Sequence, residues 1–419
     1  MMLIFGVFVA CVFFYSVLSQ RLERTVLTAP MLFTALGILT ACLPEALKEM
    51  ALERDDLLLI AELGLVMTLY TDAARVETHR LRGETNLPVR LLGTGMLLTI
   101  VLGLLGAMAL FGALSWWEAG ILAAILAPTD AGLGQVIVTS ALVPRRIRQA
   151  LNIEAGLNDG LAVPFLMFFI AVAVARETSG GGWILARFMI EQLGYGALIG
   201  VGIGLAGGWL LGLAQRKAWV AEPFLRLGVA ALPLACVLAS VATGASMFIA
   251  AFVAGLGTSV GYRDVGKHSV DFSEGLGQLF NLFVFFLFGL FVARYWTQFT
   301  VTMIAYAVLS LTLIRMAPVA LALKGTGMSW PTMLFIGWFG PRGLASIVLA
   351  LVYLEGDAQL AGETTIKLTV MVTVLLSIFA HGLSALPAIN GYAKTVASLG
   401  DRAPEQEAPD AVEPGAGHA

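Results

Sequence analysis

Charged residues are scarce in this chain. Asp, Glu, Lys and Arg make up 13% of its 419 residues, against about 25% in an average soluble domain. The three cysteines all fall in apolar runs, and no pair has the spacing of metal ligands, so we expect neither a disulfide nor a metal site built on cysteine. The four histidines form no cluster, and no nucleophile–base pairing or nucleotide-binding fingerprint is visible. We therefore expect no enzyme, no cofactor and no nucleic-acid partner.

Apolar residues dominate instead. They form 58% of the chain, the mean hydropathy is +0.87, and apolar runs recur along the whole length. These runs are about 18–27 residues long, the length that an α-helix needs to cross about 30 Å of hydrocarbon. No segment has the evenly spaced alternation of a β-barrel. The sequence predicts an all-α polytopic membrane protein, with the apolar N-terminus kept as a first helix because it lacks a basic n-region and a clear cleavage site.

We expect thirteen spans, which places the two termini on opposite sides of the membrane. If the N-terminus is outside, the inner loops and tail hold about seventeen Lys and Arg and the outer loops about six, a strong bias under the positive-inside rule. The N-terminus is therefore expected outside and the C-terminus in the cytoplasm. The expected spans are about 3–19, 27–44, 56–73, 88–112, 117–143, 147–174, 187–213, 224–242, 245–262, 275–293, 299–322, 331–353 and 364–391.

Two of these spans, the fifth and the twelfth, are interrupted by Pro and Gly beside a charged residue. They stand seven spans apart. If the seventh span is a linker, the chain divides into two six-helix halves, each with a broken fifth helix. Because seven is odd, the halves have opposite orientation, so the sequence predicts the inverted repeat found in many secondary transporters.

Three carboxylates, Asp130, Glu154 and Asp159, lie within the apolar fifth and sixth spans. An acidic side chain at the centre of a spanning helix costs roughly 2.5–3.5 kcal/mol, so three without partners would cost about 8–10 kcal/mol. Such residues face a wet cavity, a bound cation or an opposite charge. We interpret them as an ion site.

The break in the fifth span supplies oxygen ligands. Pro128 has no N–H, so the carbonyl of Ala124 loses its helical partner. Together with the oxygens of Thr129 and the carboxylate of Asp130, freed carbonyls form a hard-oxygen site that suits an alkali cation. In the twelfth span Pro341 frees a carbonyl in the same way.

Asp159 lies near the middle of the sixth span, with Asn158 beside it. Burial raises the pKa of a carboxylate, whereas a bound cation or a nearby arginine lowers it, so a group between these influences can exchange a proton for a cation. For Glu154 we expect an ion pair with Arg342 that holds the broken halves in register, and Arg315 is the competing partner. Asp72, at the inner end of the third span, is either a cation-steering group in a cytoplasmic funnel or a helix-end carboxylate near Arg75.

The motifs at these positions resemble those of the monovalent cation/proton antiporters, in particular the NhaP-like branch of sodium/proton exchangers. The resemblance covers essentially the whole membrane region. Three motifs in the expected order and spans carry it: Ala127-Pro128-Thr129-Asp130, Glu154-Ala155-Gly156-Leu157-Asn158-Asp159-Gly160 and Gly340-Pro341-Arg342-Gly343.

The resemblance implies a membrane domain over 1–400. Within it we expect a mobile core domain, about 88–174 and 299–391, which contains the crossed broken helices. The remaining parts, about 1–87 and 175–298, would form a dimerisation domain of a homodimer. Residues 401–419 are rich in Pro, Ala and acidic residues and cannot form a core, so we expect a disordered cytoplasmic tail there.

The family's ion ligands map to Asp159, Asp130 and the backbone oxygen of Thr129, and its structural pair maps to Glu154 and Arg342. An Asn-Asp pair, here Asn158 and Asp159, goes with electroneutral exchange. Similar members usually carry Ser where this chain has Ala155, which removes a hydroxyl from the site.

We therefore expect an exchanger of Na⁺, or of Li⁺ or K⁺, for H⁺ in a lipid bilayer, placed in a bacterial inner membrane. The alternatives on the same scaffold are a K⁺/H⁺ efflux system or a sodium-coupled anion symporter. A channel or a sensor is the alternative from a different class.

Overall fold

The regular elements of the described chain are all helices. The structure, a computed structural model, describes residues 2–22, 25–46, 54–75, 86–177, 181–262, 270–355, 360–399 and 403–406. Within these ranges nine helices are long and apolar enough to cross a membrane, and three shorter apolar helices accompany them. The predicted helical membrane class is confirmed over the described ranges.

Each expected span falls on a described helix or on consecutive helical segments. The count of thirteen crossings, the inverted repeat and the orientation of the termini stay predictions. The elements are α1 (Met2–Leu22), α2 (Ala29–Thr40), α4 (Arg54–Arg75), α6 (Asn86–Arg90), α7 (Met96–Leu110), α8 (Trp116–Ile125), α9 (Ala131–Thr139), α10 (Arg145–Glu177), α11 (Gly181–Met189), α12 (Gly196–Arg216), α13 (Glu222–Thr243), α14 (Met247–Gly261), α16 (Asp271–Tyr295), α17 (Val301–Leu311), α18 (Leu313–Ala322), α19 (Trp330–Trp338), α20 (Leu344–Glu355) and α21 (Glu363–Ser398), with short π-helical or 3₁₀ segments at Leu91–Gly95, Ile190–Tyr195 and Trp296–Gln298.

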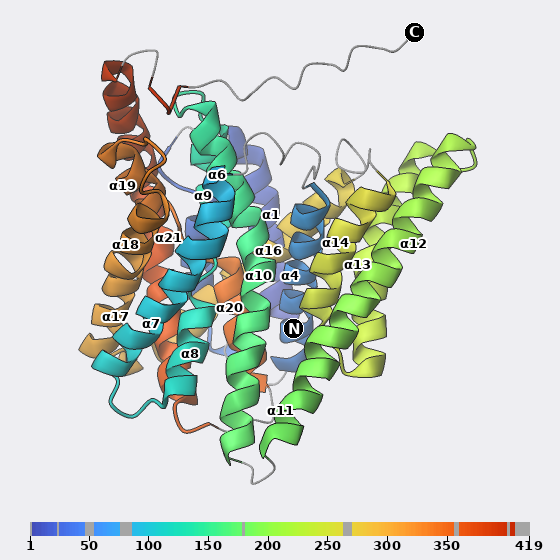
Figure 1. Cartoon of the computed structure of the whole chain (residues 1–419), viewed down its shortest axis with the longest axis horizontal. Helices are drawn as coiled ribbons and strands as arrows, with labels where there is room; N and C mark the ends of the chain where they lie inside the picture. The colour runs from blue at the N-terminus through green and yellow to red at the C-terminus, as the bar shows by residue number, and fades with distance from the viewer. Residues whose placement is uncertain are drawn as a thin grey trace.

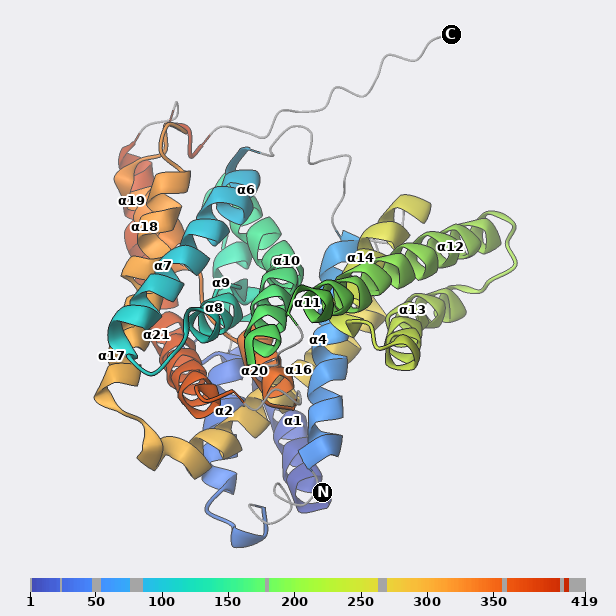
Figure 2. The same cartoon turned by 60° about the horizontal axis from the view of Figure 1, so that its bottom comes forward.

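The helices gather on two sides of a central group (Figures 1 and 2). On one side α12, α13 and α14 pack together, and α14 also packs on α4. On the other side α17, α18, α19 and α21 stand beside α7. Between them lie α10 and the short helix α20. The division into a core and a dimerisation domain is not tested by this arrangement and stays a prediction.

Close contact between α12 and α14 depends on a glycine stripe. Buried glycines recur at every fourth position of α12 from Gly196 to Gly212. A Cβ atom added at Gly204 would lie 2.4 Å from the carbonyl oxygen of Ala254 on α14. Small residues of this kind let helix backbones approach where lipid gives no hydrophobic driving force between helices.

The predicted interruptions of the fifth and twelfth spans are present. The fifth span is divided into α8 and α9 by residues 126–130, and the twelfth into α19 and α20 by residues 339–343. The eleventh span, predicted as one helix over 299–322, is also divided, into α17 and α18 at Thr312, whose φ and ψ are −111° and −95°. The predicted tail lies outside the described residues except for 403–406, which form a turn.

Candidate functional site: the crossing of two broken helices

The two breaks face each other and exchange hydrogen bonds. The N–H of Asp130 donates to the carbonyl of Pro341 at 2.8 Å. In the opposite direction, Nη1 of Arg342 donates to the carbonyls of Ala127 and Pro128 at 2.9 and 3.0 Å. Carbonyls opened by an interrupted helix must find a donor inside the membrane. Each break therefore supplies hydrogen-bond donors to the backbone carbonyls of the other.

Ser346 on α20 takes up a further carbonyl of the first break. Its hydroxyl donates to the carbonyl of Ile125 at 2.7 Å. The carbonyl of Ala124, which we expected to be freed by Pro128, instead accepts the N–H of Ala127 at 3.4 Å. Several backbone carbonyls of this break thus already accept hydrogen bonds from the protein. Fewer backbone oxygens are therefore left to bind a cation.

Asp130 links the two half-helices that leave the crossing. Its Oδ1 accepts the N–H of Leu133 at 2.9 Å and so caps α9. Its Oδ2 accepts the N–H of Leu344, at the start of α20, at 2.5 Å. A carboxylate between two helix N-termini is stabilised by the N–H groups and by both helix dipoles. Gly343 makes this possible, because a Cβ there would lie 2.1 Å from Oδ2.

Asp159 and Asn158 approach the crossing from α10. The amide nitrogen of Asn158 donates to the hydroxyl of Thr129 at 2.5 Å. Asp159 is 6% exposed, and its Oδ1 has no hydrogen-bond partner among the described residues. Asp130, Asp72 and Arg342 are near enough to act on it electrostatically. The arrangement leaves a buried carboxylate oxygen free to bind a proton or a cation.

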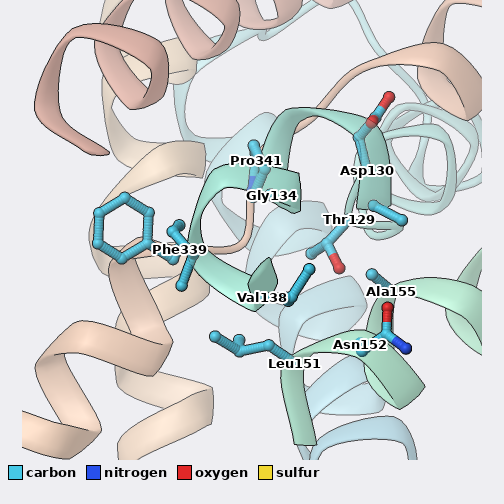
Figure 3. Close-up of a pocket in the computed structure, with 11 residues that line it drawn as sticks. Thr129, Asp130, Gly134, Val138, Leu151, Asn152, Ala155, Phe339 and Pro341 are labelled. Carbon is cyan, nitrogen blue, oxygen red and sulfur yellow. The ribbon is translucent and has the colours of Figure 1, made fainter. Parts of the chain in front are cut away.

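A small cavity opens beside Thr129 and Asp130. Figure 3 shows its lining from three segments: the break of the fifth span with α9, the start of α10, and the break of the twelfth span. Ala155 faces this space together with Asn152 from α10. Asp159 is not part of its lining. Thr129 and Asp130 thus border an open space, although the carboxylate of Asp130 points away from the other labelled lining residues.

The predicted pair between Glu154 and Arg342 is wrong, and the competing partner is the one found. Oε1 of Glu154 lies 2.6 Å from Nη1 of Arg315 on α18, and both side chains are 3% exposed. Arg342 is directed to the carbonyls of Ala127 and Pro128 instead. The guanidinium of Arg315 rests on Gly340, where a Cβ would lie 2.4 Å from its Nε. The pair therefore joins α10 to α18 against the second break.

A family model described as "Sodium/hydrogen exchanger, transmembrane" matches residues 6–390. The chain belongs to the sodium/hydrogen exchanger family.

Relatives named as antiporters of two cations match the chain. A Na⁺/H⁺ antiporter of Schizosaccharomyces pombe is 26% identical over 313 residues, which cover 66% of this chain and 65% of that protein. A K⁺/H⁺ antiporter of Alkalimonas amylolytica, NhaP, is 26% identical over 298 residues, covering 70% of this chain and 50% of that protein. The chain thus spans between half and two thirds of the length of these two relatives.

A solved structure shows the same fold. The sodium proton antiporter MjNhaP1 from Methanocaldococcus jannaschii matches with a TM-score of 0.67 at 20% identity. The match covers 91% of this chain and 99% of the other.

In this protein, Asp72 lies next to α10. A Cβ added at Gly156 would lie 3.5 Å from the Cβ of Asp72. Its neighbour Arg75 is bonded to Glu274 on α16 through both nitrogens, with Nη1 and Oε1 2.8 Å apart. Arg75 is therefore held by another carboxylate, and Asp72 is turned towards the helix that carries Asp159.

Two polar residues of α21 were not singled out in the sequence. Ser377 and His381 are both buried and contact the second break. The four histidines are dispersed along the sequence, but His381 lies inside the apolar run 364–391. The available signal was a titratable side chain one helical turn from a serine within a membrane span.

Proposed function

We propose that this protein exchanges a monovalent cation for H⁺ by alternating access. The buried carboxylate of Asp159, with a free oxygen beside the crossed breaks, is the observation on which this proposal rests most directly. Membership of the sodium/hydrogen exchanger family and the antiporter names of the relatives support it. Inverted repeats and broken helices at the membrane centre are the usual setting of ion sites in secondary transporters.

In this mechanism the cation and the proton compete for Asp159. Thr129 and Asn158 complete the site with neutral oxygens, and Asp130 adds negative charge while holding α9 and α20 in place. An empty, charged site is costly to carry through a low-dielectric barrier, so the moving part crosses only when a cation or a proton is bound. This condition makes the exchange obligatory.

One exchanging carboxylate gives a simple stoichiometry. Asn158 is neutral, so Asp159 releases one proton for each cation bound, and the exchange is electroneutral. Na⁺ is the proposed cation, with Li⁺ and K⁺ as competitors; a K⁺/H⁺ antiporter is among the relatives. Ala155 lines the cavity without a hydroxyl, so selectivity depends on Thr129, Asp130 and Asp159.

The same proposal extends to the domains, the dimer and the orientation in the membrane. The core domain, about 88–174 and 299–391, would move against a dimerisation domain formed by about 1–87 and 175–298 in a homodimer. The N-terminus would lie outside and the C-terminus in the cytoplasm of a bacterial inner membrane. Asp72, beside Gly156, would steer cations towards Asp159 from the cytoplasmic side.

The proposal is tested with purified protein in liposomes that contain a pH-sensitive dye. A proton gradient is established, and Na⁺, Li⁺ or K⁺ is added in turn with the anion varied. Cation-dependent proton movement that is independent of the anion and absent in Asp159→Asn is expected. Anion-dependent flux would support symport, and ohmic currents without a counter-ion would support a channel; either contradicts the proposal.

A further inference from the structure

Helix α21 holds both sides of the break between α19 and α20. Nε2 of His381 lies 2.8 Å from the carbonyl oxygen of Trp338, the last residue of α19. On the other side of the break, the N–H of Arg342 donates to Oγ of Ser377 at 2.6 Å. Ser377 and His381 are one helical turn apart, and Oγ of Ser377 lies 3.1 Å from Nδ1 of His381. The two side chains thus form one connected bridge across the break.

Both ring nitrogens of His381 face a carbonyl oxygen, Nε2 that of Trp338 at 2.8 Å and Nδ1 that of Ser377 at 2.9 Å. A carbonyl can only accept, and a neutral imidazole carries one N–H, so the ring donates to one of the two. We assign the proton to Nε2, because Nδ1 can then accept the hydroxyl of Ser377, which lies 3.1 Å away. In this assignment the hydroxyl donates to Nδ1 while it accepts the N–H of Arg342.

We propose that Ser377 and His381 are positioning residues for cation exchange, acting as a directed hydrogen-bond relay from Arg342 N–H through Ser377 and His381 to the carbonyl of Trp338. This inference rests on the exchange function proposed above. Neither residue touches the cation.

The relay reaches the cation site through Arg342. Its backbone is fixed by Ser377, and its guanidinium holds the carbonyls of Ala127 and Pro128, which directly precede Thr129 in the chain. A shift of Arg342 therefore moves the backbone that presents Thr129 and Asp130. Because a misplacement of about 1 Å is enough to impair a precisely arranged site, we expect the relay to affect cation binding.

A nearby contact provides a matched control. The indole nitrogen of Trp338 donates to Oγ of Ser384 at 2.9 Å, and the rings of Trp338 and His381 are 4.9 Å apart. The hydroxyl of Ser384 also donates to the backbone carbonyl of His381 at 3.4 Å within α21, but Ser384 makes no bond to the imidazole of His381 or to Arg342 among the described contacts. Ser384→Ala should lower stability without altering the cation site.

The proton positions are tested without transport. His79, His268 and His418 are replaced by Gln, so that His381 is the only histidine, and ¹⁵N NMR spectra of the labelled protein are recorded at neutral pH. The relay requires a protonated Nε2 and an unprotonated Nδ1, and the Nδ1 resonance should shift in Ser377→Ala. A ring protonated at Nδ1, a doubly protonated ring, or no shift in Ser377→Ala would overturn the relay.

The positioning role is tested by separating KM from Vmax for the cation in liposomes, with Vmax normalised to folded protein. Ser377→Ala and His381→Leu should each raise KM about tenfold, as expected for a lost buried hydrogen bond. His381→Gln, whose amide nitrogen can still donate to Trp338, should stay within about twofold of wild type, as should Ser384→Ala. The double variant S377A/H381L should raise KM no more than either single change, because both break one relay.

The two proposals fail in different ways. No exchange by the wild-type protein would overturn the proposed function. Wild-type exchange together with an unchanged KM in both Ser377→Ala and His381→Leu would overturn the positioning role alone. So would additive effects in the double variant, because residues of one relay are not independent.

Discussion

The ion pair between Glu154 and Arg315 allows a quantitative test of how the core is held together. The two charged atoms are 2.6 Å apart, and both side chains are 3% exposed. Breaking a buried pair leaves one uncompensated charge, which costs about 3–5 kcal/mol. We therefore expect Glu154→Gln and Arg315→Met each to lower the free energy of unfolding by about 3–5 kcal/mol.

The double variant should be much less destabilised than the sum of the two. Glu154→Gln with Arg315→Met removes both charges, so no unpaired ion remains in the interior, and a coupling energy of at least about 2 kcal/mol is expected. The assay is denaturant unfolding of the purified protein in detergent. The same cycle with Arg342→Met in place of Arg315→Met is the control, and its coupling should be smaller. A larger coupling of Glu154 to Arg342 than to Arg315 would refute the pairing described above.

Three further predictions concern close contacts and the C-terminal turn. Gly343→Ala places a Cβ 2.1 Å from Oδ2 of Asp130, so exchange should fall on the order of tenfold or more. Gly391→Ala, on an exposed face of α21 where the added Cβ meets nothing within 4 Å, should exchange normally; equal rates in the two variants would contradict this role of Gly343. Gly204→Ala should destabilise the protein by about 1–3 kcal/mol in thermal unfolding, because its Cβ would lie 2.4 Å from the carbonyl oxygen of Ala254. Gly202→Ala, whose Cβ meets no atom within 4 Å, should leave the stability unchanged; similar losses of stability in both variants would argue against the glycine contact. Burial raises the pKa of Glu405, but hydrogen bonds from Ser329 and Thr332 outweigh this and lower its pKa below the ordinary value. Its contribution is present above the ordinary carboxyl pKa and lost as the pH falls through the lowered one, so the difference in melting temperature between wild type and Glu405→Gln should be constant near pH 7 and shrink as the pH falls below the ordinary carboxyl pKa; a difference that grows on acidification would count against it.

The breaks in the fifth and twelfth spans could be predicted from proline and glycine beside a charged residue. Proline alone is not enough, because Pro164 and Pro233 lie inside the continuous helices α10 and α13. Pro128 and Pro341 have no N–H to donate, and nearby glycines let the backbone open further. The family membership was predictable for a related reason, because the three motifs lie at these breaks and on the adjacent sixth span. Local backbone chemistry therefore placed the two breaks correctly, whereas their crossing was implied by the family resemblance.

The arginine that pairs with Glu154 could not be predicted in the same way. Arg315 and Arg342 both lie in apolar spans, and nothing in their spacing says which one Glu154 meets. The decision depends on the interruption at Thr312, which begins α18 just before Arg315, and on Gly340, which leaves room for its guanidinium. The bridge from His381 to Trp338 likewise depends on how α21 packs against α19, which is tertiary information.

The central claim is that a cation and a proton compete for Asp159, and the pH dependence of cation KM tests it most directly. Initial exchange rates in liposomes are measured over a range of cation concentrations at several pH values. Competition predicts that KM rises as the pH falls, approaching tenfold per pH unit once Asp159 is mostly protonated, while Vmax at saturating cation stays constant. A KM that is independent of pH while Vmax falls would show that protons act elsewhere and would contradict the account.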